Sequence, residues 1–377
     1  MPHPIFEQAE FDERLLRLRG GMALIGVEVA ILDEIEAMAW VGGYGSSLNR
    51  WRCLVVPLEA APFIVIRALD ASVCRAQSWV TEVLSYQDWE NPMPVLAEAL
   101  ATCGLTGARI GLDRNSYAMS LTRFDALRAA LPDVHFLDLG PLVNELRLIK
   151  SSAEIALLRR AAAVADAAIA EAAAALRVGG TQRDAAIAVT ACFLRLGADP
   201  SLPGPISTVT GWDFLHAPLD NRILTIGDMV HIELTPRIAG YSARIMRCVS
   251  LGPPDPARLQ ATEALIRLQD AQIAAMRPGT PARAVDAILR EGVVRAGLRE
   301  SYDNITAYTL GLYAPQTPRT SDFTRILTPT ANWVMEAGMV FHVYASAGGS
   351  AISETVLVTE NGPEVLTQAP RNLLISI

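Results

Sequence analysis

The chain has 377 residues, a formal net charge of −8, and 51% apolar residues. This length favours two domains, and the apolar share is enough to build a sizeable core. The acidic balance, together with the lack of a Lys/Arg cluster, argues against a nucleic-acid partner.

The cysteines, the first residues and the apolar runs indicate the cellular compartment in which the protein is expected. Five cysteines stand at scattered positions without a C-x-x-C pair, which predicts reduced thiols rather than disulfides or a zinc site. The first residues are polar and acidic and do not resemble a signal peptide. No apolar run reaches the roughly 20 residues that a membrane helix needs. We therefore expect a cytoplasmic protein that does not bind a membrane.

Strands and helices alternate over residues 1–148. Helical spacing over residues 11–20 predicts a helix that ends at Gly20-Gly21, and the apolar stretch after it predicts a strand over 22–32. Further elements are expected as strands over 52–58, 61–69 and 108–113 and as helices over 92–105 and 121–132. This alternation predicts a small α/β domain.

A long Ala-rich helix opens the second domain, residues 149–377. Ser151 or Ser152 can cap it, with Glu154 completing a capping box, and Gly179-Gly180 ends it. Further helices are expected over 181–197, 256–276 and 281–297, and strands over 228–237, 240–251, 338–345 and 350–359. Clustered strands with segregated helices indicate an α+β class.

Four segments of this second domain, in this order, resemble the pita-bread fold of creatinase and of proline-specific and methionine aminopeptidases. They are "RLIKSSAEIALLRRAA", "LHAPLDNRILTIGDMVHIELTPRIAGYSARIMRCVSLG", "EAGMVFHVYASAGG" and "ISETVLVTENGPEVLT". The resemblance covers most of residues 150–367, and the preceding α/β domain fits it as well. It implies a pita-bread C-terminal domain preceded by a smaller creatinase-like N-terminal domain.

The metal-dependent peptidases of this family hold two divalent ions with two Asp, one His and two Glu. The matching positions of this chain carry Glu233, Arg244, Tyr308, Tyr344 and Ser353. One carboxylate remains among the five, and the guanidinium would repel a cation. The resemblance therefore implies no metal and no cofactor, and it disfavours a metal-dependent Xaa-Pro dipeptidase.

The metal-free branch of the family, which includes creatinase and ectoine hydrolase, is the nearer resemblance. The segments "FHVYASAGGSAISETVLVTENG", "HIELTP" and "YTLGLYAPQTPRT" resemble ectoine hydrolase in particular. Both enzymes cleave C–N bonds in small molecules that carry a carboxylate.

Three residues are candidates for proton transfer. His216, in "FLHAPLDNR", matches the histidine that creatinase uses to move protons, and a pKa near neutrality suits that task. A loop histidine that is satisfied by hydrogen bonds is the alternative. Glu233 could act as a base if burial raised its pKa, or it could form an ion pair with Arg244. His342 shares a strand face with Tyr344 and is a reserve base.

Two arginines are candidates for binding a substrate carboxylate, which a planar guanidinium fits well. Arg50 matches the arginine with which the first domain of creatinase reaches the substrate of a neighbouring subunit, which implies a homodimer. Arg319, in "APQTPRTSD", matches a second one. The alternative is two solvated surface charges, and Arg52 competes with Arg50.

Four further residues are expected to contact the substrate. Tyr308 and Tyr344 could donate hydrogen bonds to a developing oxyanion, or they could fill the volume of the lost metal site. Arg244 and Glu354 are expected near the same place.

The function that these patterns favour is metal-independent hydrolysis of a C–N bond in a small carboxylate-bearing amide, amidine or cyclic analogue, with ectoine as the first candidate. The alternatives are a non-catalytic pita-bread protein that binds a small molecule and a lyase acting on a related small acid.

Overall fold

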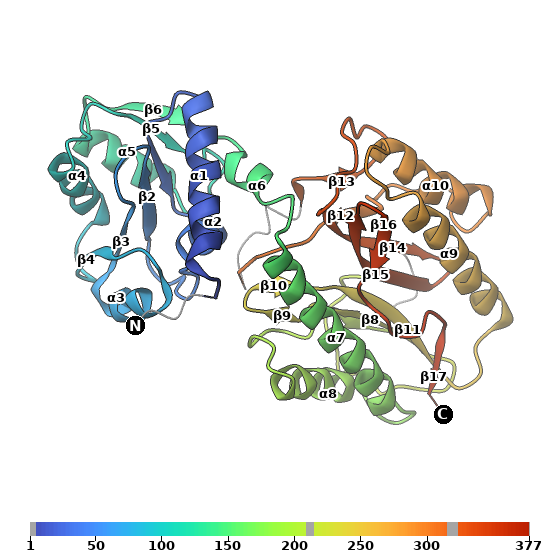
Figure 1. The fold of residues 1–377 in the computed structure, drawn as a ribbon. Helices are drawn as coiled ribbons and strands as arrows, with labels where there is room; N and C mark the ends of the chain where they lie inside the picture. Colours follow the sequence, from blue (N-terminus) through green and yellow to red (C-terminus); the bar gives the residue numbers. More distant parts are fainter. Residues whose placement is uncertain (1–4, 209–214, 315–322, 377) are drawn as a thin grey trace. The chain divides into compact units, whose positions relative to one another are not determined.

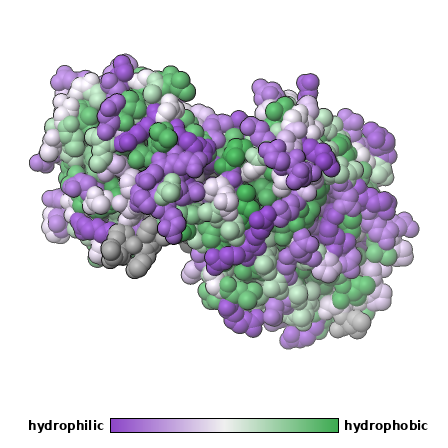
Figure 2. Space-filling model, viewed as in Figure 1, coloured by the Kyte–Doolittle hydropathy of each residue, from purple (hydrophilic) through white to green (hydrophobic). Residues whose placement is uncertain are grey.

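The computed structural model describes residues 5–208, 215–314 and 323–376. The chain divides into two compact units, of which the first ends at Arg147 and the second begins at Leu148. Figure 1 shows the elements of both units. Hydrophilic side chains cover much of the face of each unit that Figure 2 presents, with apolar side chains between them.

The N-terminal unit is built on a six-stranded sheet in the order β4-β3-β2-β1-β5-β6. Its strands are β1 (Val29–Leu32), β2 (Cys53–Pro57), β3 (Phe63–Arg67), β4 (Glu82–Tyr86), β5 (Arg109–Leu112) and β6 (His135–Asp138). Its helices are α1 (Gln8–Leu24), α2 (Ile35–Gly42), α3 (Ala68–Gln77), α4 (Pro92–Thr102), α5 (Leu121–Ala130) and α6 (Leu142–Leu146). Strand β1 runs antiparallel to β2 and parallel to β5, so the sheet is mixed.

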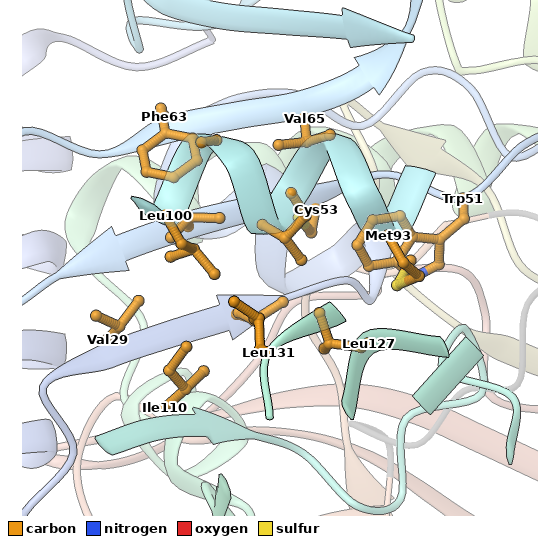
Figure 3. Close-up of a cluster of buried hydrophobic side chains, with 14 of the residues drawn as sticks. Val29, Trp51, Cys53, Phe63, Val65, Met93, Leu100, Ile110, Leu127 and Leu131 are labelled. Atoms are coloured by element: carbon orange, nitrogen blue, oxygen red, sulfur yellow. The ribbon is translucent and has the colours of Figure 1, made fainter. Parts of the chain in front are cut away.

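One apolar cluster holds this sheet to its helices. Val29, Cys53 and Val65 from the strands meet Leu100 of α4 and Leu127 of α5, and all five side chains are fully buried (Figure 3). Such close-packed contact between a sheet face and its covering helices is what stabilises an α/β layer.

The prediction that the first helix ends at Gly20-Gly21 is wrong, because α1 continues to Leu24 and the strand begins only at Val29. Buried Leu18 and Met22 continue one helical stripe across the glycine pair. A side chain at position 21 would collide with Leu142 of α6. Tertiary packing therefore overrides the low helix propensity of glycine here.

The C-terminal unit contains a sheet that comprises nine strands in the described part of the chain, with the main order β13-β12-β14-β15-β11-β8-β7. Its strands are β7 (Ile206–Ser207), β8 (Met229–Leu234), β11 (Ile245–Leu251), β12 (Ala307–Thr309), β13 (Ile326–Leu327), β14 (Val340–Ala347), β15 (Ser350–Thr359), β16 (Gly362–Val365) and β17 (Leu374–Ser376). A separate two-stranded ribbon pairs β9 (Arg237–Ile238) with β10 (Tyr241–Ser242).

The helices in the described part of this unit are α7 (Ser152–Ala175), α8 (Gln182–Arg195), α9 (Pro256–Ala274) and α10 (Ala282–Arg295). Helix α7 packs against β8 and β11, and α9 packs against β14 and β15. The predicted capping box is present, because Ser151 Oγ accepts from the Glu154 N–H at 3.2 Å and Glu154 Oε2 accepts from the Ser151 N–H at 2.9 Å.

Two further expectations can be compared with the structure. All five cysteines lie in described residues and carry free thiols, as predicted. No helix among the described residues is long and apolar enough to cross a membrane.

Candidate active site

A cavity of about 250 Å³ lies on the large sheet of the C-terminal unit. Its walls come from β8, β11, β12 and β14 and from the loops that precede β8, β12 and β13. The residues that line it are Leu215, His216, Glu233, Arg244, Met246, Asn304, Ile305, Tyr308, Phe323 and Tyr344.

The register of the sheet explains why these residues meet. Glu233 pairs with Met246, Met246 with Ser353, and Ser353 with Tyr344. Paired residues in a sheet point to the same face, so these side chains form one row across four strands. His342 lies two residues before Tyr344 and shares this face, and the two rings stack with their centroids 5.3 Å apart.

Glu233 and His216 face each other with opposite exposure. Glu233 Oε2 lies 3.9 Å from His216 Nε2; the carboxylate side chain is 4% exposed and the imidazole 82%. Burial raises the pKa of Glu233, and the charges of Arg244 and His216 partly offset this rise. Oε2 of Glu233 is buried and has no hydrogen-bond partner among the described residues. A buried, unpartnered carboxylate oxygen beside an accessible imidazole is suited to proton transfer.

The backbone of Glu233 is fixed by the segment before β7. Its N–H donates to the carbonyl of Pro205 at 2.8 Å. Gly204 adopts a φ of +121°, and a Cβ at that position would collide with the Glu233 carbonyl oxygen. A glycine is therefore required at this close approach.

Arg244 is buried in the wall of the cavity. Its guanidinium donates to the hydroxyls of Tyr308 and Tyr313, the latter at 3.2 Å from Nη2. Its backbone is fixed by Thr355, whose Oγ1 accepts from the Arg244 N–H at 2.8 Å and donates to the Arg244 carbonyl at 2.9 Å. The guanidinium thus has a defined position at the cavity.

Tyr344 of β14 lines the cavity, whereas His342, expected as a reserve base on the same strand face, is not among the described lining residues. Tyr344 Oη accepts from Asn304 Nδ2 at 3.3 Å, and burial raises the pKa of Tyr344. His342 Nδ1 lies 2.8 Å from Tyr308 Oη. Burial lowers the pKa of His342 well below its ordinary value, and the charge of Arg244 adds to this effect.

Glu354, expected to contact the substrate, is not among the described residues that line the cavity. It follows Ser353 on β15, so its side chain points to the opposite face. Its carboxylate lies 2.8 Å from Arg247 and 3.1 Å from Arg371 and accepts from Thr367. The structure thus places Glu354 in a buried ion-pair network. Burial raises its pKa, and the two arginines oppose that shift.

Neither of the two candidate carboxylate-binding arginines is among the described residues that line the cavity. Arg50 belongs to the N-terminal unit and is exposed. Arg319 lies outside the described residues. The competitor Arg52 is 5% exposed, and its Nε and Nη2 have no hydrogen-bond partner within the described ranges.

Several residues at the cavity were not predicted from the sequence. Asn304, Ile305 and Phe323 lie in the region of weakest motif similarity, and Leu215 lies next to His216 without a chemical group of its own. Tyr313 and Thr355 hold Arg244 and lie within segments that carry the family resemblance, but they were not singled out as site residues. The strand register could have identified Thr355, because it pairs with His342 across β14 and β15.

The side chains at the cavity do not form a set that suits a metal ion. Within the described ranges, no group of three or more His, Cys, Asp and Glu residues could hold one. Among the described residues that line the cavity, Glu233 is the one carboxylate, and the Arg244 guanidinium lines the same space. Divalent ions favour several anionic oxygen or imidazole ligands, so this donor set does not fit a two-metal centre.

Comparison with known proteins identifies two family models along the chain. The model "Metallopeptidase family M24" matches residues 156–360, and the model "Creatinase/Prolidase N-terminal domain" matches residues 14–149. Among curated proteins, ectoine hydrolase from Halomonas elongata is 26% identical over 399 residues, which cover 98% of each chain. The Xaa-Pro dipeptidase of Pyrococcus furiosus is 27% identical over 245 residues, which cover 63% of this chain and 68% of that one.

The solved structures agree with these matches. An Xaa-Pro dipeptidase from Bacillus anthracis superimposes with a TM-score of 0.83 at 21% identity, covering 97% of this chain and 100% of that one. The predicted fold class is thereby confirmed: a pita-bread C-terminal domain follows a smaller creatinase-like N-terminal domain.

Proposed function

The chain belongs to metallopeptidase family M24, and we propose that it is a metal-independent hydrolase of this family. Its substrate is a small carboxylate-bearing amide or amidine, cyclic or acyclic, in which it cleaves a C–N bond; ectoine is the first candidate. The observation that carries this proposal is the cavity in which Arg244 accompanies Glu233, the single carboxylate among its described lining residues. A guanidinium favours an anionic substrate and disfavours a metal ion at the same place.

Glu233 and His216 carry the proton transfers in this proposal. One of them removes a proton from a water molecule while the oxygen of that water forms a bond to the carbon of the C–N or C=N group. The C–N bond then breaks, and the proton is returned to the departing nitrogen. One water is consumed, so a cyclic substrate gives one product that is heavier by one water, and an acyclic substrate gives two fragments whose summed mass exceeds that of the substrate by one water.

The positive and hydrogen-bonding groups of the cavity orient the substrate. Arg244 and the Tyr344 hydroxyl face its oxygen atoms, and Glu233 faces its nitrogen. Arg50 of a second copy and Arg319 are proposed to hold the substrate carboxylate, which makes the active form a homodimer. Fixing the substrate against the proton-transfer groups is a large part of what such a site contributes.

Two kinds of relative support different functions for this chain. Ectoine hydrolase matches almost the whole chain and acts on the compound that its name states. The Xaa-Pro dipeptidase of Pyrococcus furiosus matches over about two thirds of its own length, and the Xaa-Pro dipeptidase from Bacillus anthracis matches over its whole length. A peptidase of that kind would use the metal ions of the family, and the donor set at the cavity does not fit them.

The test is a mass-spectrometric screen of the purified protein with ectoine, other cyclic amidines, acyclic amides with a carboxylate, and proline dipeptides. A gain of one water, in a single ring-opened product or summed over two fragments, supports the proposal. Release of a fragment without a gain of water identifies a lyase. Binding without any product across the panel identifies a non-catalytic protein. Proline dipeptides are themselves carboxylate-bearing amides, so cleavage of these alone identifies a dipeptidase and contradicts ectoine as the substrate.

A further inference from the structure

One buried side chain, that of Gln182, bonds to the chain on both sides of His216. Gln182 is the first residue of α8 and is fully buried. Its Nε2 donates to Thr208 Oγ1 at 3.0 Å, and its Oε1 accepts from the Asp220 N–H at 3.1 Å. We call the stretch between these two partners, residues 208–220, the His216 loop; the structure describes its residues 208 and 215–220. A single amide thus joins both ends of this loop.

The position of His216 depends on how the ends of the loop are held. The imidazole side chain is largely exposed, and residues 215–220 lie in turn or irregular structure. An exposed side chain on an irregular segment must lose backbone and rotamer freedom before it can occupy one position. The distance of 3.9 Å between His216 Nε2 and Glu233 Oε2 is therefore set largely by the anchors of the loop.

Helix α8 connects this anchor to the sheet that carries Glu233. The N–H of Thr181 donates to Asp184 Oδ2 at 2.8 Å, which fixes the first turn of the helix. Helix α8 packs against α7 and β7, and α7 packs against β8 (Figure 1). Glu233 lies on β8. Gln182 therefore fixes the loop relative to the same packed layer that positions Glu233.

The residue after Gln182 makes a related but weaker contact. Arg183 Nε donates to Asn221 Oδ1, and both residues are exposed, so water competes for this bond. Asn221 also comes after the loop, whereas the partners of Gln182 lie on both sides of His216. The Gln182 amide is fully buried, and a bond that is lost there leaves polar groups without a partner, which costs more than the loss of an exposed bond.

We propose that Gln182 is a positioning residue for the proton transfer, because its buried amide closes the His216 loop and holds the imidazole within reach of Glu233. This inference rests on the proposed function for the role of His216, whereas the anchoring of the loop does not depend on it. An amide suits this place because it offers a donor and an acceptor at the same time. One end serves the Thr208 hydroxyl and the other the Asp220 N–H.

The first test is hydrogen–deuterium exchange at the Asp220 amide, read by mass spectrometry with fragmentation to single residues. Asp220 is exposed and lies outside regular secondary structure, so protection of its amide reports the bond to Gln182. Gln182→Met keeps the length of the side chain and removes both hydrogen-bonding groups. We expect exchange at Asp220 to become about three- to tenfold faster, which is the effect of losing one hydrogen bond.

Gln269→Met is the matched control for this measurement. Gln269 is also fully buried, and its Nε2 donates to the carbonyls of Val343 at 3.0 Å and Ile352 at 3.3 Å. The same chemical change on α9 should leave exchange at Asp220 as in the wild type. An unprotected Asp220 amide in the wild type, or equal acceleration in both variants, would overturn the anchor. This readout needs no turnover, so it stays valid if the proposed reaction is wrong.

The second test is a double-mutant cycle between Gln182→Met and His216→Ala. If Gln182 acts through His216, its substitution should lower kcat about 10–100-fold in the wild-type background, the effect of a misplaced group, and should have no effect in the His216→Ala background. The same fold loss in both backgrounds would show a purely structural role and overturn the positioning role. If Gln182→Met does not fold, Thr208→Val removes one of the two bonds from the side of the loop and should give the same pattern.

The two tests separate the anchor from the proposed function. Turnover that His216→Ala leaves intact, together with an Asp220 amide that Gln182 protects, would contradict the role of His216 and support the anchor. Loss of turnover in His216→Ala, with full turnover in Gln182→Met, would support the role of His216 and overturn the positioning role of Gln182.

Discussion

At the scale of single residues, the different parts of Glu233 and His216 in the proposed proton transfer follow from the different exposure of their side chains. The carboxylate is buried and has an unpartnered oxygen, whereas the imidazole 3.9 Å away is accessible to solvent. A buried carboxylate can hold a proton at a pH at which an exposed one has lost it, and an exposed imidazole can exchange its proton with water.

Glu233→Gln should lower kcat by about 10²–10⁴-fold, the usual effect of losing a general base. In the wild type, the acidic limb of the rate profile should lie above the ordinary glutamate pKa of 4.5, because burial raises that of Glu233. When folding raises the pKa of a group, that group stabilises the folded state fully at pH values below its pKa in the unfolded state. This stabilisation is lost as the pH rises through its pKa in the folded state. Near pH 7 the neutral amide of Glu233→Gln should therefore leave the protein at least as stable as the wild type, as thermal unfolding would measure. Full activity of this variant would remove Glu233 from the reaction.

His216→Ala should lower kcat by about 10²-fold or more. The matched control is His135→Ala, because His135 is also exposed but lies on β6 of the N-terminal unit. Steady-state rates of the two variants on the same substrate make the comparison. Equal rates for both would contradict a role for His216.

At the scale of elements, the alternation of faces along β15 decides which residues reach the cavity. Ser353 and Thr355 share the face of Tyr344 and His342, with which they pair, and Glu354 between them points the other way. The sequence predicted this strand at its observed bounds, 350–359. The sequence also predicted Glu354 as a substrate contact, which the structure does not support. A motif shows which residues are neighbours along the chain, but not to which face of the sheet each side chain points.

Glu354→Gln should destabilise the C-terminal unit by about 3–5 kcal/mol, because it leaves the buried Arg247 without its charge partner. Denaturant unfolding measures this change. Ser353→Ala on the same strand is the matched control, and its smaller effect would separate the lost ion pair from a general disturbance of β15. A loss of less than about 0.5 kcal/mol in Glu354→Gln, the range of ordinary surface changes, would contradict the role of the network.

Local sequence patterns predicted the start of α7 but not the end of α1. The capping box at Ser151 and Glu154 was readable because its two residues lie three positions apart. The end of α1 was not, because Leu142, which packs on Gly21, lies more than a hundred residues away in the sequence. The same limit hid Thr355 and Tyr313, whose role is to hold a side chain from another strand.

At the scale of the whole molecule, the order of the segments predicted the fold, and the two family models together cover both units. The substrate could not be predicted in the same way. The cavity is lined by residues such as Asn304 and Phe323 that carry no motif, and their positions depend on loops. The proposed homodimer, with Arg50 serving the site of a second copy, is a property of two chains.

We propose that this protein hydrolyses its substrate without a metal ion, although the family is known for holding metal ions at this site. This proposal is tested most directly by product formation from ectoine with protein that has been stripped with EDTA, assayed with the chelator present and again after addition of Mn²⁺, Co²⁺ or Zn²⁺. We predict a product heavier by one water, formed at the same rate under all four conditions. Turnover that disappears with EDTA and returns with one of the metals would contradict the claim.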